Sequence, residues 1–236
     1  MTSNIYNNIK ETSQSIYDAY NNLVFNEDKR VFQKMTKKIE LYLDVKDKGI
    51  FGDIVEFGVF KGGGVALWLK LRELYEPHSL TKVIGFDFFE PKETVDSLAD
   101  ENKELMTNVL NRVSSDDLLL ESVKSRLTVF NEENYILIKG NAVEKSKDYY
   151  TKNKGAKIKL LYMDLDVGEP TYQILKELWS KLSIGGIVIC DEYGFHGWDE
   201  TIGVDKFLNE LDKNTYELEN TNIISPTLII RKKNSS

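Results

Sequence analysis

Short apolar runs alternate with longer amphipathic stretches along most of this chain, and the two patterns predict different elements. Apolar runs of a few residues are typical of strands, whereas apolar residues repeated at helical spacing are typical of helices. The strands predicted in this way are 53–56, 82–86, 135–140, 158–164 and 186–192, and the helices between and after them are 62–75, 141–149, 169–182 and 201–211. This alternation predicts an α/β fold with a doubly wound, mostly parallel sheet.

One predicted strand indicates which part of the sheet is buried, and the last two indicate how the sheet ends. The run at 158–164 is continuously apolar up to its final aspartate, as in a strand that is buried on both faces. The segments 216–219 and 223–230, which are separated by a polar Asn-Thr-Asn, predict a closing pair with an antiparallel C-terminal strand.

Two helical regions lie outside the alternation. The N-terminal 1–48 carries two amphipathic patterns and predicts a helical cover on the sheet, with an active-site lid or a dimer element as the alternatives. Residues 90–134 are longer than an ordinary crossover and predict a helical insertion near the substrate, or an inert surface excursion. At 236 residues, 1–236 is expected to form one domain.

Composition narrows the classes of partner. A formal charge of −7 argues against nucleic acid as the main partner, and one cysteine, Cys190, fits a reducing compartment. The N-terminal sequence is polar, and no apolar run approaches the roughly 18 residues that span a membrane. We therefore expect a soluble cytoplasmic protein without a membrane partner. The oligomeric state stays open, a homo-oligomer included.

A glycine-rich turn follows the first predicted strand. That strand ends at Glu56, and Gly58 and the triplet 62–64 separate it from the next helix, a layout that lets a nucleotide-like ligand approach the backbone. Asp87 ends the second strand, where a carboxylate can accept hydrogen bonds from both ribose hydroxyls. The spacing departs from the G-x-G-x-x-G pattern of nicotinamide dinucleotide sites, and the acidic residue comes late. A glutamate before the first glycine favours a cationic ligand such as S-adenosylmethionine, which has an ammonium, a sulfonium and no phosphate.

Acidic residues collect at the carboxyl ends of the predicted strands, where ligands of open α/β sheets bind. They are Glu56, Asp87, Asp164, Asp166, Asp191 and Glu192. Carboxylates that lie close together raise each other's pKa, and a bound cation removes that conflict. A hard ion such as Mg²⁺ or Ca²⁺ would suit oxygen ligands, and a purely structural rim is the alternative.

Several motifs together resemble the macrocin and mycinamicin O-methyltransferases over about residues 50–208. These motifs are VEFGVFKGGG, GFDFFE, the run from YMDLDVGEPTYQ to IVICDEYG, and the later GVDKF. The resemblance implies a class I methyltransferase fold, similar to the Rossmann fold, and a metal-dependent enzyme that uses S-adenosylmethionine to methylate sugar hydroxyls. It places the metal, expected to be Mg²⁺, on Asp164, Asp191 and Glu192, and it makes Asp166 the general base. The expected cofactor contacts are Glu56, Gly58, Gly62, Gly63, Asp87, Gly140, Asn141, Ala142 and Asp164.

The chain also departs from that family in ways that bear on the acceptor. The family usually has Asp-Asp before Tyr193, where this chain has Asp191 and Glu192, and a tyrosine of the family is replaced by Gly168. An additional piece, GFHGWDE, follows the acidic pair. It contains His196, a second candidate for the base or a residue of a surface loop, and Trp198, which could stack on the acceptor or anchor the core.

The expected reaction is therefore methyl transfer to a sugar hydroxyl, with a nucleotide-linked sugar or a glycosylated natural product as acceptor. Two alternatives stay open. One is a metal-dependent methyltransferase of a catechol-like diol, and the other is a non-catalytic binding protein that keeps the fold.

Overall fold

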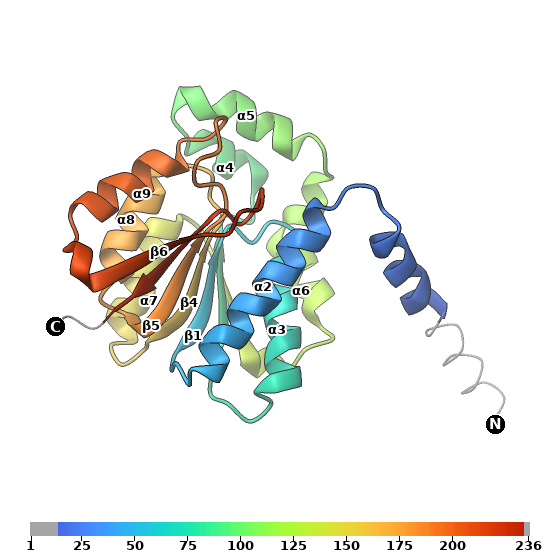
Figure 1. Ribbon diagram of the computed structural model, residues 1–236. Helices are drawn as coiled ribbons and strands as arrows, with labels where there is room; N and C mark the ends of the chain where they lie inside the picture. The colour runs from blue at the N-terminus through green and yellow to red at the C-terminus, as the bar shows by residue number, and fades with distance from the viewer. Residues whose placement is uncertain (1–13, 234–236) are drawn as a thin grey trace.

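A seven-stranded sheet forms the centre of the computed structural model, which describes residues 14–233 (Figure 1). The strand order is β3-β2-β1-β4-β5-β7-β6; β1 to β5 are parallel, and β7 runs antiparallel to both of its neighbours. The strands are β1 Asp53–Phe57, β2 Val83–Asp87, β3 Tyr135–Lys139, β4 Ile158–Met163, β5 Leu182–Cys190, β6 Tyr216–Asn220 and β7 Leu228–Lys232. The predicted doubly wound sheet with an antiparallel C-terminal strand is confirmed. Its order reverses between β1 and β4, which opens a crevice at their carboxyl ends.

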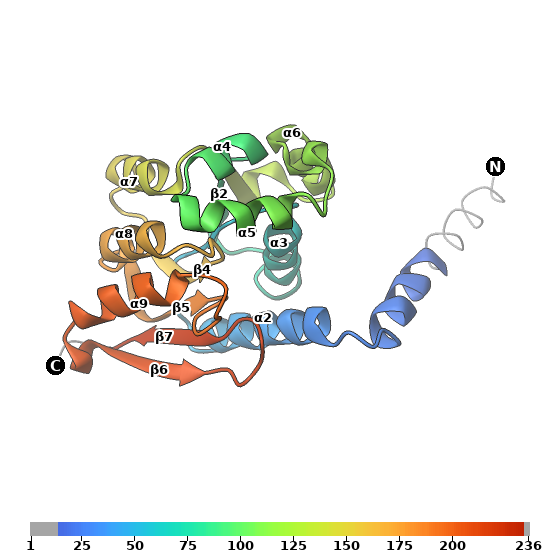
Figure 2. The same ribbon diagram turned by 90° about the horizontal axis from the view of Figure 1, so that it is seen from above.

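Helices cover both faces of the sheet (Figures 1 and 2). The helices α2, α3 and α6 pack on one face, and α7, α8 and α9 pack on the other. Their bounds are α2 Arg30–Asp47, α3 Gly63–Tyr75, α6 Leu120–Leu127, α7 Ala142–Lys152, α8 Gly168–Leu178 and α9 Glu200–Asn209. Two further helices, α4 Pro91–Asp96 and α5 Asp100–Leu110, lie over the carboxyl ends of the strands.

The period-two alternation of β-strands divides the core into two layers. On β4, Leu161 and Met163 pack toward α7 and α8, whereas Leu160 and Tyr162 pack toward α2 and α3. All six residues of β4 are buried, so the prediction of a strand buried on both faces is confirmed.

Three predicted boundaries are wrong for identifiable reasons. The helix predicted to reach residue 182 ends at Leu178, and β5 begins at Leu182, so the strand includes the predicted Ser-Ile-Gly-Gly turn. An irregularity in the β4–β5 register absorbs the extra residues there. The last strand begins at Leu228 rather than at residue 223, because 222–226 form a bend that contains Pro226, which has no N–H for the ladder.

The predicted cover and insertion each divide into two parts. Within 1–48, α2 packs on the sheet, whereas the helix at 14–24 projects from the rest of the chain with exposed side chains, and residues 1–13 lie outside the described part (Figure 2). Within 90–134, α6 joins the core through Val123 and Leu127, while α4 and α5 stand over the crevice. No helix within 14–233 combines the length and the apolar character needed to cross a bilayer.

A buried charge pair ties β4 to the end of α3. The side chain of Lys159 is 1% exposed, and its Nζ lies 2.7 Å from Glu76 Oε2. The same oxygen accepts a 2.5 Å hydrogen bond from the Tyr42 hydroxyl. Burial would raise the pKa of Glu76, but Lys159 and Tyr42 outweigh it and hold that pKa below its ordinary value.

Replacing Glu76 with glutamine should therefore destabilise the fold by about 3 kcal/mol, because the Lys159 ammonium would stay buried without a carboxylate. Urea unfolding at neutral pH measures the difference. Glu121→Gln is the matched control, since its pair with Lys124 is exposed and should be worth less than about 1 kcal/mol.

The pH dependence of that difference has a definite sign. The pKa of Glu76 is lower in the folded state than its ordinary 4.5, so its contribution is complete above pH 4.5 and is lost as the pH falls through the lowered value. The stability gap between wild type and Glu76→Gln should narrow on acidification. A gap that stays constant down to pH 2.5 would contradict the assignment.

Candidate active site

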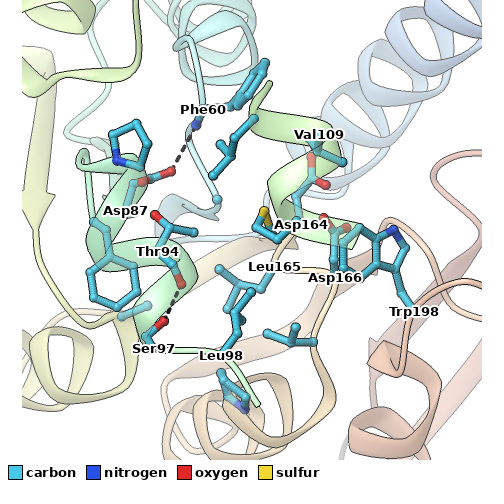
Figure 3. Close-up of a pocket in the computed structure, with 18 of the residues that line it drawn as sticks. Phe60, Asp87, Thr94, Ser97, Leu98, Val109, Asp164, Leu165, Asp166 and Trp198 are labelled. Atoms are coloured by element: carbon cyan, nitrogen blue, oxygen red, sulfur yellow. Dashed lines mark hydrogen bonds between the residues drawn. The ribbon is translucent and has the colours of Figure 1, made fainter. Parts of the chain in front are cut away.

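A cavity of about 400 Å³ lies at the carboxyl ends of β1, β2, β4 and β5 (Figure 3). Loops after these strands form its floor, and α4 and α5 form the opposite wall. Its position is the switch point of the sheet, where open α/β folds bind their ligands.

The glycine turn after β1 is held against β4. Gly58 has a φ of 85°, and a Cβ placed there would lie 1.9 Å from the carbonyl oxygen of Asp164. Only glycine fits this approach and this conformation. The turns that follow β1 and β4 are thus in direct backbone contact beneath the cavity.

Asp87 fastens the same turn from β2. Its Oδ2 accepts hydrogen bonds from the backbone N–H groups of Val59 (2.8 Å) and Phe60 (3.0 Å), and its Oδ1 accepts one from Phe89 (2.8 Å), as Figure 3 shows in part. Burial raises the pKa of Asp87, and these hydrogen bonds oppose that effect. A carboxylate has about four acceptor positions, so one is left for a ligand hydroxyl.

Glu56 lies behind the turn rather than in the cavity. It is 2% exposed, it is absent from the cavity lining, and it accepts a 2.6 Å hydrogen bond from Trp68 Nε1 on α3. A Cβ on Gly64 would lie 2.2 Å from its Oε1, so the glycine makes room for the carboxylate. The glycine triplet thus accommodates Glu56 beneath the helix.

The expected cofactor residues therefore separate into two groups. Those that line the cavity are Gly58, Asp87, Asn141, Ala142 and Asp164, and those that do not are Glu56, Gly62, Gly63 and Gly140. The residues of the second group lie in or behind the glycine turn and in the loop after β3. They support these loops and do not contact the cavity.

Four of the expected acidic residues line one side of the cavity. Asp164 and Asp166 follow β4, and Asp191 and Glu192 follow β5, whose last residue pairs with the last residue of β4. Glu200, the first residue of α9, lies beside them and accepts a hydrogen bond from the Glu192 N–H. Sequence reasoning missed Glu200, because an acidic residue in the first turn of a helix is ordinary.

Burial and mutual repulsion shift these carboxyl groups. Burial, together with the charges of Glu192 and Asp191, raises the pKa of Asp166 to about 7. Burial and neighbouring carboxylates also raise the pKa of Asp164, Glu192 and Glu200. Asp166 has a φ of 67°, an uncommon conformation that costs on the order of 1–3 kcal/mol and is typical of functional sites.

Lys34 on α2 supplies the cation that contacts this cluster. Its Nζ lies 2.7 Å from Asp191 Oδ2 and 3.2 Å from Asp164 Oδ2. Burial would lower the pKa of Lys34, but the two carboxylates reverse that and raise it. Burial would likewise raise the pKa of Asp191, yet Lys34 and hydrogen bonds from Tyr162 and Ser225 hold it below its ordinary value.

The donor chemistry of the cluster fits a divalent cation. Among residues 14–233, no three His, Cys, Asp or Glu side chains are already arranged around a metal position. The available atoms are nevertheless carboxylate oxygens, as Mg²⁺ prefers, and the buried Oε2 atoms of Glu192 and Glu200 have no hydrogen-bond partner. The cluster also has five carboxyl groups, and the single positive charge of Lys34 cannot neutralise all of them. The residues therefore suit a further cation, although Lys34 now uses two of the oxygens.

The two candidates for the base differ in position. Asp166 lines the cavity, whereas His196 is exposed on the loop before α9 and is not part of the lining. Trp198, from the same loop, does line the cavity near Asp166 (Figure 3). Sequence reasoning left open whether Trp198 faces a ligand or the core, and the structure places it at the cavity.

That loop and α9 meet the start of α8 at two glycines. A Cβ on Gly203 would lie 2.0 Å from the carbonyl oxygen of Gly168, and a Cβ on Gly168 would lie 2.5 Å from that of Asp199. The Gly168 N–H also donates a 2.9 Å hydrogen bond to Asp199 Oδ1. The chain that follows Asp166 is thereby fixed to the start of α9.

The wall opposite the carboxylates is apolar, and it comes from the segment 90–134 that was expected to be either an insertion near the substrate or an inert surface excursion. It is made by Leu98, Met106, Val109 and Leu110 from the α4–α5 region and by Leu118 from the short 3-10 turn that follows α5. Helical periodicity in 90–134 showed that apolar residues would share a face, but it could not show that the face covers a ligand site rather than the core.

Comparisons with known proteins give a family match and similar solved folds. The family model of the macrocin O-methyltransferases (TylF) matches residues 28–222. Among solved structures, the O-methyltransferase NovP is 21% identical with a TM-score of 0.66, over 85% of this chain and 79% of its own. CalS11, described as a TDP-rhamnose 3'-O-methyltransferase of calicheamicin biosynthesis, is 25% identical with a TM-score of 0.61, over 94% of this chain and 93% of its own. No curated protein matches the chain in sequence.

Proposed function

Since the chain belongs to the macrocin O-methyltransferase (TylF) family, and thus to the O-methyltransferases that use S-adenosylmethionine, we propose that it methylates a sugar hydroxyl with the help of a divalent cation. The observation that carries this proposal is the position of Asp166. A carboxyl group with a pKa of about 7 lines the cavity beside an excess of carboxylates. A base whose pKa lies near the working pH is well suited to proton transfer.

Each part of the site has a role in this reaction. S-adenosylmethionine supplies the methyl group, and a divalent cation on Asp164, Asp191 and Glu192, expected to be Mg²⁺, supplies Lewis acidity toward the acceptor hydroxyl. Asp166 accepts the proton of that hydroxyl. The turn around Gly58 and the remaining acceptor position of Asp87 bind the cofactor, and the apolar wall from residues 98–118 excludes water and orients the acceptor.

The cavity lining favours one of the two expected acceptor classes. A nucleotide-linked sugar would match the substrate that the name of CalS11 states. The cavity, however, has six acidic lining residues and one basic residue, Lys34, and its far wall is apolar. A diphosphate would be repelled there, so we favour an uncharged glycosylated natural product. A methyl-transfer assay in the presence of Mg²⁺ tests the proposal, with a glycoside, a nucleotide-linked sugar and a catechol as alternative acceptors.

Each outcome of that assay has a distinct meaning. Methylation of a glycoside supports the favoured acceptor, and methylation of a nucleotide sugar corrects it. Turnover of the catechol alone would favour the diol alternative. Binding of the cofactor without turnover of any acceptor would favour a non-catalytic protein. A cytoplasmic location and a possible homo-oligomer remain predictions that cell fractionation and light scattering can test.

The choice of cofactor gives a separate prediction. Calorimetry should show binding of S-adenosylhomocysteine and none of NAD. Asp87→Ala should weaken that binding by about 1.5–3 kcal/mol, the usual value of a hydrogen bond to a charged group. Glu93→Ala on α4 is the control, because Glu93 is exposed and outside the cavity lining. Tight binding of NAD with no response to the homocysteine analogue would overturn the prediction.

A further inference from the structure

We propose that Lys34 competes with the divalent cation for the carboxylates of Asp164 and Asp191, so that metal binding requires the Lys34 ammonium to withdraw together with the start of α2. The inference rests on the proposed metal requirement. It assigns a role in metal affinity to Lys34, a residue far in sequence from the predicted ligands. It also couples the N-terminal segment to the occupancy of the metal site.

The contacts of Asp191 make the competition direct. Its Oδ1 accepts hydrogen bonds from Tyr162 and Ser225, and its Oδ2 accepts one from Lys34 at 2.7 Å. The side chain is 3% exposed, so solvent offers it little else. A cation that ligates Asp191 through Oδ2 would have to share that oxygen with the Lys34 ammonium. The same holds for Asp164 Oδ2, 3.2 Å from the ammonium.

Charge gives a second reason. An ammonium and a divalent cation at the same two oxygens would repel each other strongly in a buried site. With Lys34 in place, its positive charge partly offsets the repulsion between the two aspartates in the metal-free protein. Metal binding in the presence of that ammonium would have to overcome both the repulsion and the sharing of these oxygens.

The start of α2 is the part of the helix that can move. Lys34 lies in its second turn, its side chain is 33% exposed, and the N-cap residue Lys29 makes no side-chain capping bond. The buried residues of the helix, Lys38, Leu41, Tyr42 and Val45, all follow Lys34 in the chain. The segment before α2 is the exposed helix at 14–24, which projects away from the rest of the chain (Figure 2). It therefore does not pack against the start of α2.

The neighbouring lysine on α2 does not compete in the same way. Lys38 lies one turn after Lys34, and its Nζ sits 3.6 Å above the ring of Tyr162 rather than on a carboxylate of the cluster. Withdrawal of Lys34 would therefore leave a cation near the site without occupying the metal ligands.

The test is a calorimetric titration of the full chain with Mn²⁺ and with Mg²⁺, without cofactor or acceptor. Lys34→Met keeps the length of the side chain and removes the charge, and it should bind the metal at least about tenfold more tightly than wild type, equivalent to 1.4 kcal/mol. Lys34→Arg keeps the charge and should stay close to wild type. Lys37→Met is the matched control, since Lys37 pairs with Glu40 on the same helix.

Hydrogen exchange of the wild-type protein gives a readout that does not depend on a variant. Adding Mn²⁺ should increase exchange of the amides near residues 30–37, because the helix start loses its anchor, while amides of 41–47 stay protected. If Lys34→Met does not fold, this measurement decides alone.

The outcomes separate the inference from the function on which it rests. Equal or weaker metal binding by Lys34→Met overturns the competition but leaves metal dependence standing, as does unchanged exchange at 30–37 in a protein that binds the metal. Absence of metal binding in both wild type and Lys34→Met overturns the proposed metal requirement, and the competition with it.

Discussion

Asp166→Asn is expected to lower kcat by roughly 10²- to 10⁴-fold, the usual contribution of a general base. Asparagine keeps the shape of the side chain and removes its basicity. The position of Asp166 in the cavity and its pKa of about 7, which burial and the charges of Glu192 and Asp191 produce, make it the group best able to take the acceptor proton. Steady-state methyl transfer measures the loss, and calorimetry should show that binding of S-adenosylhomocysteine and Mn²⁺ is nearly unchanged.

His196→Ala is the control for that experiment. Its side chain is exposed and outside the cavity, so the variant should keep nearly wild-type turnover. If His196→Ala instead abolishes turnover while Asp166→Asn retains most of it, the role of base passes to His196. If Asp166→Asn loses Mn²⁺ binding, Asp166 is a metal ligand and the base is another group.

Removal of divalent cations should abolish turnover, and added Mg²⁺ should restore it. A hydroxyl resembling that of water has a pKa of about 15.7, far above that of Asp166, so the base needs an acceptor that a cation has acidified. EDTA treatment followed by titration with Mg²⁺ in the methyl-transfer assay measures the effect. Metal affinity should fall at low pH, because protons compete for the carboxylates.

Two variants and one binding measurement control for loss of structure. Asp191→Asn should prevent restoration by Mg²⁺, since it removes a ligand charge, whereas Glu192→Asp keeps the charge and should retain activity. S-adenosylhomocysteine should still bind after EDTA treatment, because the turn around Gly58 is held by Asp87 and not by a metal. Full activity in the chelated enzyme would refute the metal requirement.

The parts of the fold that local pattern controls could be predicted from the sequence. The apolar run of β4 and the glycine turn after β1 identified the centre of the sheet, and the strand ends placed Asp164 and Asp191 on neighbouring strands. The predicted start of β5 was wrong because a register irregularity depends on the neighbouring strand, and the amino-acid sequence of the strand itself does not indicate it.

The missed parts of the site depend on tertiary contacts. Lys34 is 157 positions from Asp191 in the chain, and no local pattern joins them. A trace of the contact exists, because Lys34 and Lys38 share the spacing of the buried Leu41, Tyr42 and Val45 on α2. A lysine on the buried face of a helix indicates a carboxylate or an aromatic ring beneath it, as Lys34 and Lys38 show in turn, but the sequence could not show which residues these are.

The glycine contact between α8 and α9 limits which side chains this crossing can accept. The space above Gly168 is filled by Asp199 and Gly203. A side chain at 168 and the present course of 194–203 exclude each other. A larger residue at 168 or at 203 would therefore require the start of α9 to move away from the start of α8, so the two segments can change only together.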